Sequence, residues 1–491
     1  MAGSRASRLS APVALEPARL DRSTPRFLLL VALPLALVVA FATPLYPQVA
    51  CAIALLVAVL AVYASDRRRG LFALLALWFV VPGVRRVLGY TTVQLANDPL
   101  SLLPFVATAG AALIELTRAR IPRPGLLAAT AIGVAFAIGL PLGFAEAPLP
   151  AMFAFGAYVS GLGGGLLLGA TLPRDEPIRV LFRAVLVLVP LIALYALWQR
   201  IAGLPRWDQA WLDFSGFWSI IVEREGALRV FSTLNSPGTL APLLAFGLLA
   251  ALVLRRRPTF ALAFAALCGV ALALTYVRSA WLALIAGALA FVVATRGRAL
   301  PAVAGFAITA VAVTALLSPV SPAAREVVAR VHTISAASSD RSVNERRQTL
   351  VEQLPASLTK PLGHGVGSAG EPSRLRGETP LRAPDNGYLS LLYQLGPIGF
   401  GLVAMVLAAA AGRASRLLRE DEGELRAWAF ALLAYYLVQL TAQDTFYGVH
   451  GVILGLLLGW ALGSPVGGVD RRLARAATVD RRTLADGSRL R

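Results

Sequence analysis

Four stretches of this 491-residue chain together contain arginine, carboxylate, amide and hydroxyl side chains. Each stretch lies beside long apolar segments. Arginine presents a planar fork of donors that binds phosphate oxygens in pairs, and a carboxylate can take a proton from a hydroxyl. The combination favours a reaction at a phosphate-bearing substrate. The stretches are LRVFSTLNSPGTLA (228–241), TYVRSAW (275–281), RSVNERRQTLVEQLPASLTKPLGHGVGSAG (341–370) and DNGYLSLLYQLGPIGFG (385–401).

The first two stretches offer one candidate phosphate-binding arginine each. Arg278 has the hydroxyls of Thr275 and Ser279 beside it, which suits a phosphate. The alternative is that Arg278 simply extends to the lipid headgroups. In the first stretch the candidate arginine is Arg229, and Asn235 of the same stretch is a candidate for binding a glycan or its acceptor. Asn-Ser-Pro is equally a good capping sequence for the apolar helix that follows.

The third stretch carries a basic cluster of Arg341, Arg346 and Arg347. Such a cluster suits a diphosphate headgroup presented by a lipid, although the charged face of a solvated amphipathic helix explains it equally well. GHGVGSAG, which follows, is too rich in glycine for a helix, and it forms either an anion-binding nest of backbone amides or an ordinary loop. His364 within it is a candidate for glycan or acceptor binding.

The fourth stretch begins with Asp385, the candidate that takes a proton from an attacking sugar hydroxyl. Asn386 and Tyr388 are candidates for glycan or acceptor binding. The alternative is that Asp-Asn-Gly forms a turn or caps the next helix. No cluster has the composition and spacing of metal ligands, so we expect neither a metal nor another cofactor.

The composition predicts a polytopic membrane protein. Hydrophobic residues make up 57% of the chain and charged residues 15%, with a mean hydropathy of +0.69, far from the values of soluble domains. About fourteen segments reach the length of a membrane span, which is about 17–25 residues. Pro82 and Gly83 interrupt the segment 71–88. The segments are 26–43, 47–64, 71–88, 99–117, 125–144, 151–172, 178–202, 238–254, 258–277, 280–295, 299–318, 387–411, 427–443 and 448–464.

The arginines explain the net charge of +19 through topology. Short connections that hold arginine alternate with connections such as 43–47 and 443–450, which hold none, and positively charged loops stay in the cytoplasm. We therefore do not expect nucleic acid as a partner. The same alternation places Arg278 at a tight outer turn between two spans.

Two longer segments fall on the outer side in this arrangement. In the second of them, AREVVARVHTI and SVNERRQTLVEQL have apolar residues at helical spacing and predict amphipathic helices on the membrane surface. The predicted organisation is a cytoplasmic leader (1–25), transmembrane helices 1–11 (26–318) with an outer loop at about 204–239, a large periplasmic loop (319–384), transmembrane helices 12–14 (385–464) and a cytoplasmic Arg-rich tail (465–491).

Few ionisable residues lie inside the predicted spans. A proton-driven transporter is expected to hold acids or histidines near the middle of the membrane. The polar side chains are concentrated on one face instead, which favours an enzyme that acts at the outer surface on a lipid-borne substrate.

The order of NSPGTLA, TYVRSAWLAL, the ERR segment, PLGHGVGSAG and DNGYLSLLYQLGPIGFG resembles the O-antigen ligase and Wzy-type O-antigen or exopolysaccharide polymerase family of bacterial membrane glycosyltransferases. The resemblance covers about Arg229 to Ala411. It implies a GT-C-like helical fold and an undecaprenyl-diphosphate-linked glycan as donor. It also implies metal-independent transfer on the outer face of the cytoplasmic membrane. By motif position, the arginines with which the family holds the diphosphate resemble Arg278 and one arginine of 341–347.

One departure bears on the type of transfer. Ligases of this family commonly have a histidine before the Asn of the motif that precedes the late span, and this chain has Asp385 there. The departure favours an inverting polymerase that joins lipid-linked repeat units over a ligase that passes glycan to a lipid or protein. A lipid-linked oligosaccharide flippase or other transporter is the rival from a different class. Expected partners are the lipid-linked glycan and membrane lipids, with other polysaccharide-assembly proteins as further candidates.

Overall fold

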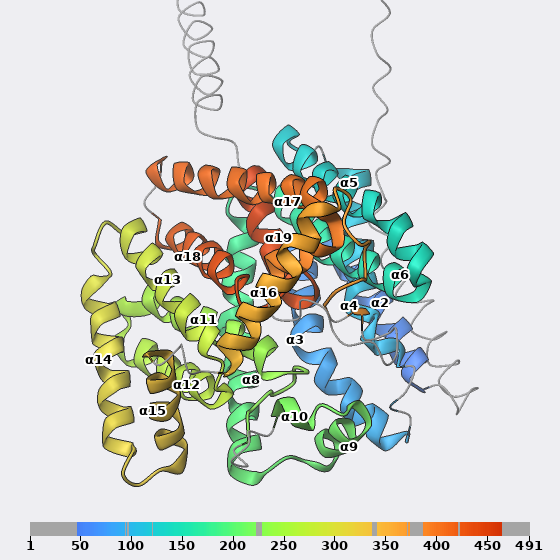
Figure 1. The fold of residues 1–491 in the computed structure, drawn as a ribbon. Helices are drawn as coiled ribbons and strands as arrows, with labels where there is room; N and C mark the ends of the chain where they lie inside the picture. Colours follow the sequence, from blue (N-terminus) through green and yellow to red (C-terminus); the bar gives the residue numbers. More distant parts are fainter. Residues whose placement is uncertain are drawn as a thin grey trace, which may run out of the picture.

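The chain forms one bundle of helices (Figure 1). The computed structural model describes residues 47–93, 95, 98–119, 121–221, 228–335, 341–370, 372–373, 386–420 and 423–463. The elements are α2 (Pro47–Ser65), α3 (Arg67–Thr91), the 3-10 turn η1 (Pro99–Ser101), α4 (Leu103–Arg118), α5 (Arg123–Glu146), α6 (Pro148–Tyr158), the π-helical turn η2 (Val159–Gly163), α7 (Gly164–Thr171), α8 (Glu176–Ala202), α9 (Arg206–Ser215), α10 (Trp218–Ile221), α11 (Pro237–Val253), the 3-10 turn η3 (Leu254–Arg256), α12 (Pro258–Thr275), α13 (Arg278–Ala294), α14 (Leu300–Leu317), α15 (Pro322–Ser335), α16 (Arg341–Thr359), α17 (Gly387–Glu420), α18 (Glu424–Gln439) and α19 (Gly448–Gly463).

The prediction of a polytopic helical membrane protein is confirmed. Nine helices in the described part of the chain are long and apolar enough to cross a membrane, and α13 and α19 are shorter apolar helices. Leu127 and Leu316 are 70% and 76% exposed on the bundle surface, as is expected of side chains that face lipid. α3 runs unbroken through Pro82, which neighbouring helices make tolerable within a membrane.

The finer count of about fourteen spans stays a prediction. The segment 26–43 lies outside the described residues. The segments 99–117 and 427–443 correspond to α4 and α18, which have 16 residues each.

Ion pairs tie the helices together at the end where the arginine-rich connections lie. Each joins two elements that are distant in sequence, and the side-chain nitrogens and oxygens are 2.8–3.1 Å apart. The pairs are Arg67–Glu115, Arg68–Glu176, Arg255–Glu424 and Arg426–Asp175. The opposite helix ends carry the predicted functional stretches.

Glycines at every fourth position join α7 and the π-helical turn to α19. A Cβ atom at Gly165 would overlap the carbonyl of Val452, and one at Gly459 would overlap the carbonyl of Leu166. The two backbones therefore touch, as in small-residue packing between membrane helices. This packing holds the start of α19 against the π-helical turn that follows Tyr158.

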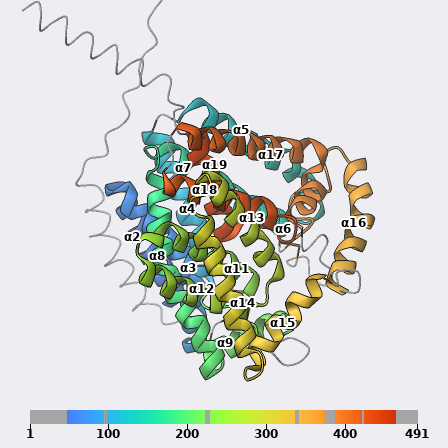
Figure 2. The ribbon, with the colours of Figure 1, turned by 90° about the vertical axis from the view of Figure 1, so that its left-hand side faces the viewer.

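Helices α15 and α16 lie at the edge of the bundle, where Figure 2 shows them as an arm joined to α17. They occupy part of the segment 319–384. On α16, Val351 is 66% exposed and Leu358 is 55% exposed, so an apolar face of this helix points away from the bundle.

Candidate functional site

A tight turn between α12 and α13 presents Arg278. Only Tyr276 and Val277 separate the two helices, and Tyr276 has a left-handed backbone with φ of 54°. The hydroxyl of Thr275 accepts a hydrogen bond from the Val277 amide at 3.3 Å. Arg278 is the first residue of α13 and is half-buried, so its charge lies at a helix end, as the sequence predicts.

Arg229 lies on the same turn. Its Nε donates to the carbonyl oxygen of Thr275 at 3.1 Å, and the next amide, of Val230, donates to the carbonyl of Leu274 at 3.2 Å. The structure thus brings the arginines of the first two stretches to the end of one helix, α12.

The connection between α18 and α19 is the centre of a second polar group. Oδ2 of Asp444 accepts hydrogen bonds from the hydroxyls of Tyr158, at 2.7 Å, and Ser390, at 3.0 Å. Its Oδ1 accepts from the amide of Phe446 at 3.1 Å. Burial raises the pKa of the Asp444 carboxyl, while these three hydrogen bonds act in the opposite direction.

Gln394 extends this group into the glycine-rich loop 361–370. Its Nε2 donates to the hydroxyls of Tyr158 and Ser390 at 3.2 and 3.1 Å. Its Oε1 accepts the amide of Gly367 at 2.8 Å. A residue of α17 therefore holds the loop against Asp444.

The hydrogen bonds of the loop favour the ordinary-loop alternative over an anion-binding nest. The amides from His364 to Gly367 donate to protein acceptors, namely the Tyr393 carbonyl, the Gln394 carbonyl, the Gly139 carbonyl and the Gln394 side chain. An amide has one proton to donate, so these four are not available to an anion. The loop instead packs on the kink of α17 at Gly396, where φ is 64° and a Cβ atom would overlap the Pro361 carbonyl.

His364, Asn386 and Tyr388 have local roles in this arrangement. The His364 ring stacks on Tyr393 with centroids 3.9 Å apart. Asn386 Oδ1 accepts the Leu389 amide at 3.0 Å and so caps α17. The Tyr388 hydroxyl donates to the carbonyl of Leu437 at 2.9 Å. The Tyr388 contact joins α17 to α18, whereas those of His364 and Asn386 are made with α17 itself. Asp385 lies outside the described residues.

Two glutamines connect the Arg278 turn with the Asp444 group. Gln439, at the end of α18, donates from Nε2 to the hydroxyl of Ser279 at 3.3 Å and to Oε1 of Gln443 at 3.0 Å. The Gln443 side chain in turn lies against Gly238 at the start of α11, where a Cβ atom would be 3.1 Å from its Nε2. The four stretches therefore contribute residues to one region at one end of the bundle.

One part of the chain, which contains the Arg278 turn, the glycine-rich loop and the start of α17, matches a known family. Residues 263–404 match the O-antigen ligase family. The match supports the resemblance drawn from the sequence motifs. No curated protein matches the chain.

The O-antigen ligase match covers Arg278, the α16 arginines and the start of α17. Arg346 and Arg347 are exposed on α16, and Arg341 is the first residue of that helix with its side chain outside the described set. Arg229 and Asn235 precede the matched range. Asn235 is half-buried directly before the cap of α11, in which the Ser236 hydroxyl accepts the Thr239 amide at 3.1 Å.

Sequence reasoning missed the connection QDTFYGVH (443–450) as a part of this polar region. Its lack of lysine and arginine marked it only as an outer connection. The available signal was the run of Gln439, Gln443 and Asp444, which places amide and carboxyl groups at the end of an apolar helix.

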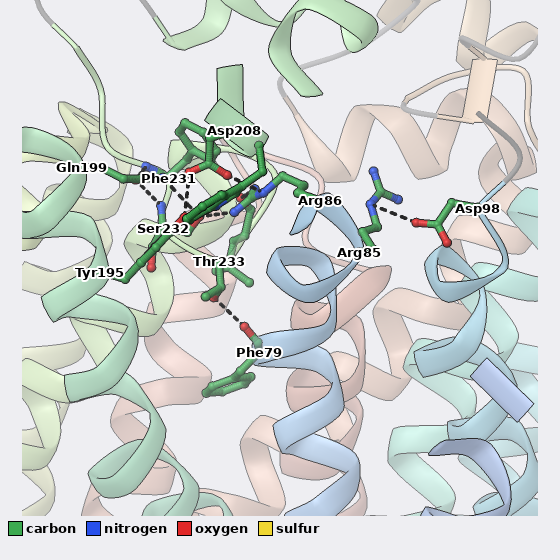
Figure 3. A network of polar contacts seen from close by, with 12 residues as sticks. Phe79, Arg85, Arg86, Asp98, Tyr195, Gln199, Asp208, Phe231, Ser232 and Thr233 are labelled. Atoms are coloured by element: carbon green, nitrogen blue, oxygen red, sulfur yellow. Dashed lines mark hydrogen bonds and ion pairs between the residues drawn. The ribbon is translucent and has the colours of Figure 1, made fainter. Parts of the chain in front are cut away.

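Sequence reasoning also missed a buried ion pair beside the first stretch (Figure 3). Nε of Arg86, on α3, lies 2.9 Å from Oδ1 of Asp208, on α9, and neither side chain is exposed. Arg86 also donates to the carbonyls of Ser232 and Leu234. A charged pair thus holds the chain that leads from Arg229 to Asn235.

Proposed function

We propose that the chain is a membrane glycosyltransferase that takes its glycan from an undecaprenyl-diphosphate carrier. The observation that carries the proposal is the O-antigen ligase family match over residues 263–404, with Arg278 half-buried at the start of α13 inside it. The convergence of Arg229 on the same turn supports it, because two guanidinium groups suit the charge of a diphosphate.

In this proposal the arginines bind the leaving group. Arg278 and Arg229 hold the diphosphate of the donor, and an arginine of α16, Arg341, Arg346 or Arg347, completes the site when the lipid is bound. Positive charge fixed at this position stabilises the negative charge that develops on the departing diphosphate. The protein's own side chains supply this stabilisation, so the mechanism needs no metal.

Asp385 then acts as the base in the proposed reaction. It takes the proton from an acceptor sugar hydroxyl, whose oxygen attacks the anomeric carbon of the donor glycan. The bond between that carbon and the phosphate oxygen breaks on the opposite face, so the configuration inverts. The undecaprenyl diphosphate leaves with the bonding electrons. Binding both lipid-borne reactants at one site adds a proximity contribution to the rate.

We infer that the transfer is polymerisation, in which the acceptor is a second lipid-linked repeat unit. Asp385 in place of the histidine that ligases commonly carry supports this choice. Transfer to a lipid or protein acceptor, as by a ligase, is the second candidate, because the matched family is named for it. We further propose a GT-C-like bundle in the cytoplasmic membrane with this site on its outer face. The arginine-rich connections at the other helix ends support that orientation.

Purified protein incubated with a lipid-linked repeat unit tests the proposal. Products with two or more joined units are expected for a polymerase, while transfer only to an added acceptor would make the protein a ligase. Failure to form any glycosidic bond would overturn the proposal and favour a flippase.

A further inference from the structure

We propose that Arg86 and Asp208 form a positioning clamp that fixes residues 231–234, and through them Arg229 and Asn235, for the transfer reaction. This inference rests on the proposed function for its catalytic meaning. Its structural part, the immobilisation of one backbone segment by a buried ion pair, stands independently. Figure 3 shows the clamp and its neighbours.

Arg86 holds the carbonyl side of the segment. Its Nη1 donates to the carbonyl oxygen of Leu234 at 2.6 Å, and its Nη2 donates to that of Ser232. The guanidinium also lies over the rings of Phe231 and Trp211, at 4.9 and 5.4 Å from their centroids. The fork of one arginine thus bridges two peptide groups, a geometry that lysine cannot reproduce.

Asp208 and Gln199 hold the amide side. Oδ2 of Asp208 accepts from Nε2 of Gln199 at 2.7 Å and from the hydroxyl of Tyr195 at 2.9 Å. Oriented in this way, Oε1 of Gln199 accepts the amides of Ser232 at 2.8 Å and Phe231 at 3.3 Å. Both sides of one short backbone segment therefore bond to a single connected network.

The conformation that the clamp holds is one the chain does not adopt readily. Ser232 has φ of 56°, in the left-handed region that residues other than glycine seldom occupy. Its hydroxyl donates to the Ile192 carbonyl at 2.5 Å, and that of Thr233 donates to the Phe79 carbonyl at 2.6 Å. Strained backbone of this kind persists only where its surroundings over-determine it, and it clusters at functional sites.

A buried ion pair commonly adds little net stability to a folded protein, because removing both charges from water costs free energy. Burial raises the pKa of Asp208, which means that the site disfavours its charge. Apolar side chains of similar volume commonly replace such pairs without loss of stability. The pair does, however, impose a definite geometry. The segment it fixes begins two residues after Arg229, which bonds to the Arg278 turn, and ends directly before Asn235.

The decisive variant replaces both charges by apolar groups, as Arg86→Met with Asp208→Leu. Turnover of the lipid-linked repeat unit is measured, together with hydrogen exchange of the amides of residues 228–241. We expect the double variant to fold with a similar melting temperature. We also expect it to lose about a hundredfold in kcat, since a misplacement of about 1 Å has effects of this size, and to exchange the Ser232 amide at least about tenfold faster.

Two further variants make the test specific. Arg85 precedes Arg86 on α3, and its Nε lies 3.9 Å from Asp98, to the side of the clamp in Figure 3. Arg85→Met is therefore the matched control, and we expect its kcat and exchange to stay within about twofold of wild type. Arg86→Lys keeps the charge but loses the fork, and we expect most of the loss in kcat to remain.

The outcomes distinguish a failure of the clamp proposal from a failure of the proposed function. Inactive wild-type protein would overturn the proposed function, while the hydrogen-exchange comparison would still test the clamp. Unchanged exchange in the double variant overturns the clamp, as does full activity of Arg86→Lys. If the double variant does not fold, Arg86→Lys alone is compared with Arg85→Met, and equal kcat and exchange in these two variants overturn the clamp.

Discussion

Removal of the Tyr158 hydroxyl tests whether Asp444 organises the polar region. The phenol donates to the Asp444 carboxylate at 2.7 Å, and its ring stacks on Phe136 with centroids 4.7 Å apart. Tyr158→Phe keeps the ring and its packing, so the change isolates the hydroxyl. Gln394 keeps its bond to Ser390, and Asp444 keeps two of its three hydrogen bonds.

The expected effect follows from the charge on the acceptor. Hydrogen bonds to charged groups contribute about 1.5–3 kcal/mol, and those between neutral groups about 0.5–1.5 kcal/mol. Tyr158→Phe should therefore lower the free energy of unfolding by about 2 kcal/mol. Tyr388→Phe is the matched control, because the Tyr388 hydroxyl donates to a neutral carbonyl, that of Leu437.

Equilibrium unfolding in mixed micelles, followed by tryptophan fluorescence, measures both variants under the same conditions. The Tyr158 variant should lose more stability than the Tyr388 variant. A loss no larger than that of the control would show that the carboxylate does not carry the interaction, and the reasoning that makes Asp444 a centre would be refuted.

Three further predictions address the arginine turn, the opposite end of the bundle and the helix packing. Arg278→Lys keeps a charge but loses bidentate binding, about 1.5–3 kcal/mol, so the transfer rate should fall about tenfold to a hundredfold; an unchanged rate would exclude a diphosphate at Arg278. Burial acts to raise the pKa of Asp175, but hydrogen bonds from Arg426 and Trp460, together with the positive charges of Arg426 and Arg174, outweigh it, and the pKa lies below its ordinary value of 3.8. The stability from Asp175 is therefore complete above that value and is lost as the pH falls through the lowered pKa. A scan of melting temperature from about pH 5 downward should show this loss of stability, and the loss should be smaller in Asp175→Asn. Equal pH dependence of the melting temperature in both proteins would contradict the lowered pKa of Asp175. Gly459→Ala should lower the melting temperature because its Cβ overlaps the Leu166 carbonyl, whereas Gly401→Ala, with open space around it, should not; equal effects would contradict the close packing of α7 on α19.

The sequence predicted the Arg278 turn well, because long apolar runs on both sides leave few positions for the connection. Hydropathy and the positive-inside rule also predicted a helical membrane protein. They were less informative at Pro82, where the sequence suggested an interruption and α3 continues. Propensity describes the isolated segment, whereas the neighbouring helices that satisfy its backbone are not visible in the sequence.

The contacts of the site were largely beyond sequence reasoning. Arg86 and Asp208 are far apart along the chain, and no local pattern reports their pairing. The glycine-rich loop was compatible with an anion nest until the structure showed its amides bonded to α5 and α17. Asp444 was missed because a single carboxylate in a short polar connection resembles an ordinary solvated residue. Asp385 remains a prediction, since it lies outside the described residues.

The most direct test of the central claim is the release of undecaprenyl diphosphate by purified protein given a lipid-linked repeat unit. If the chain is a glycosyltransferase of the proposed kind, one molecule of lipid diphosphate should be released for each new glycosidic bond, and Arg278→Lys should slow both equally. Glycan transfer without release of the lipid diphosphate, or neither transfer nor release, would contradict the account.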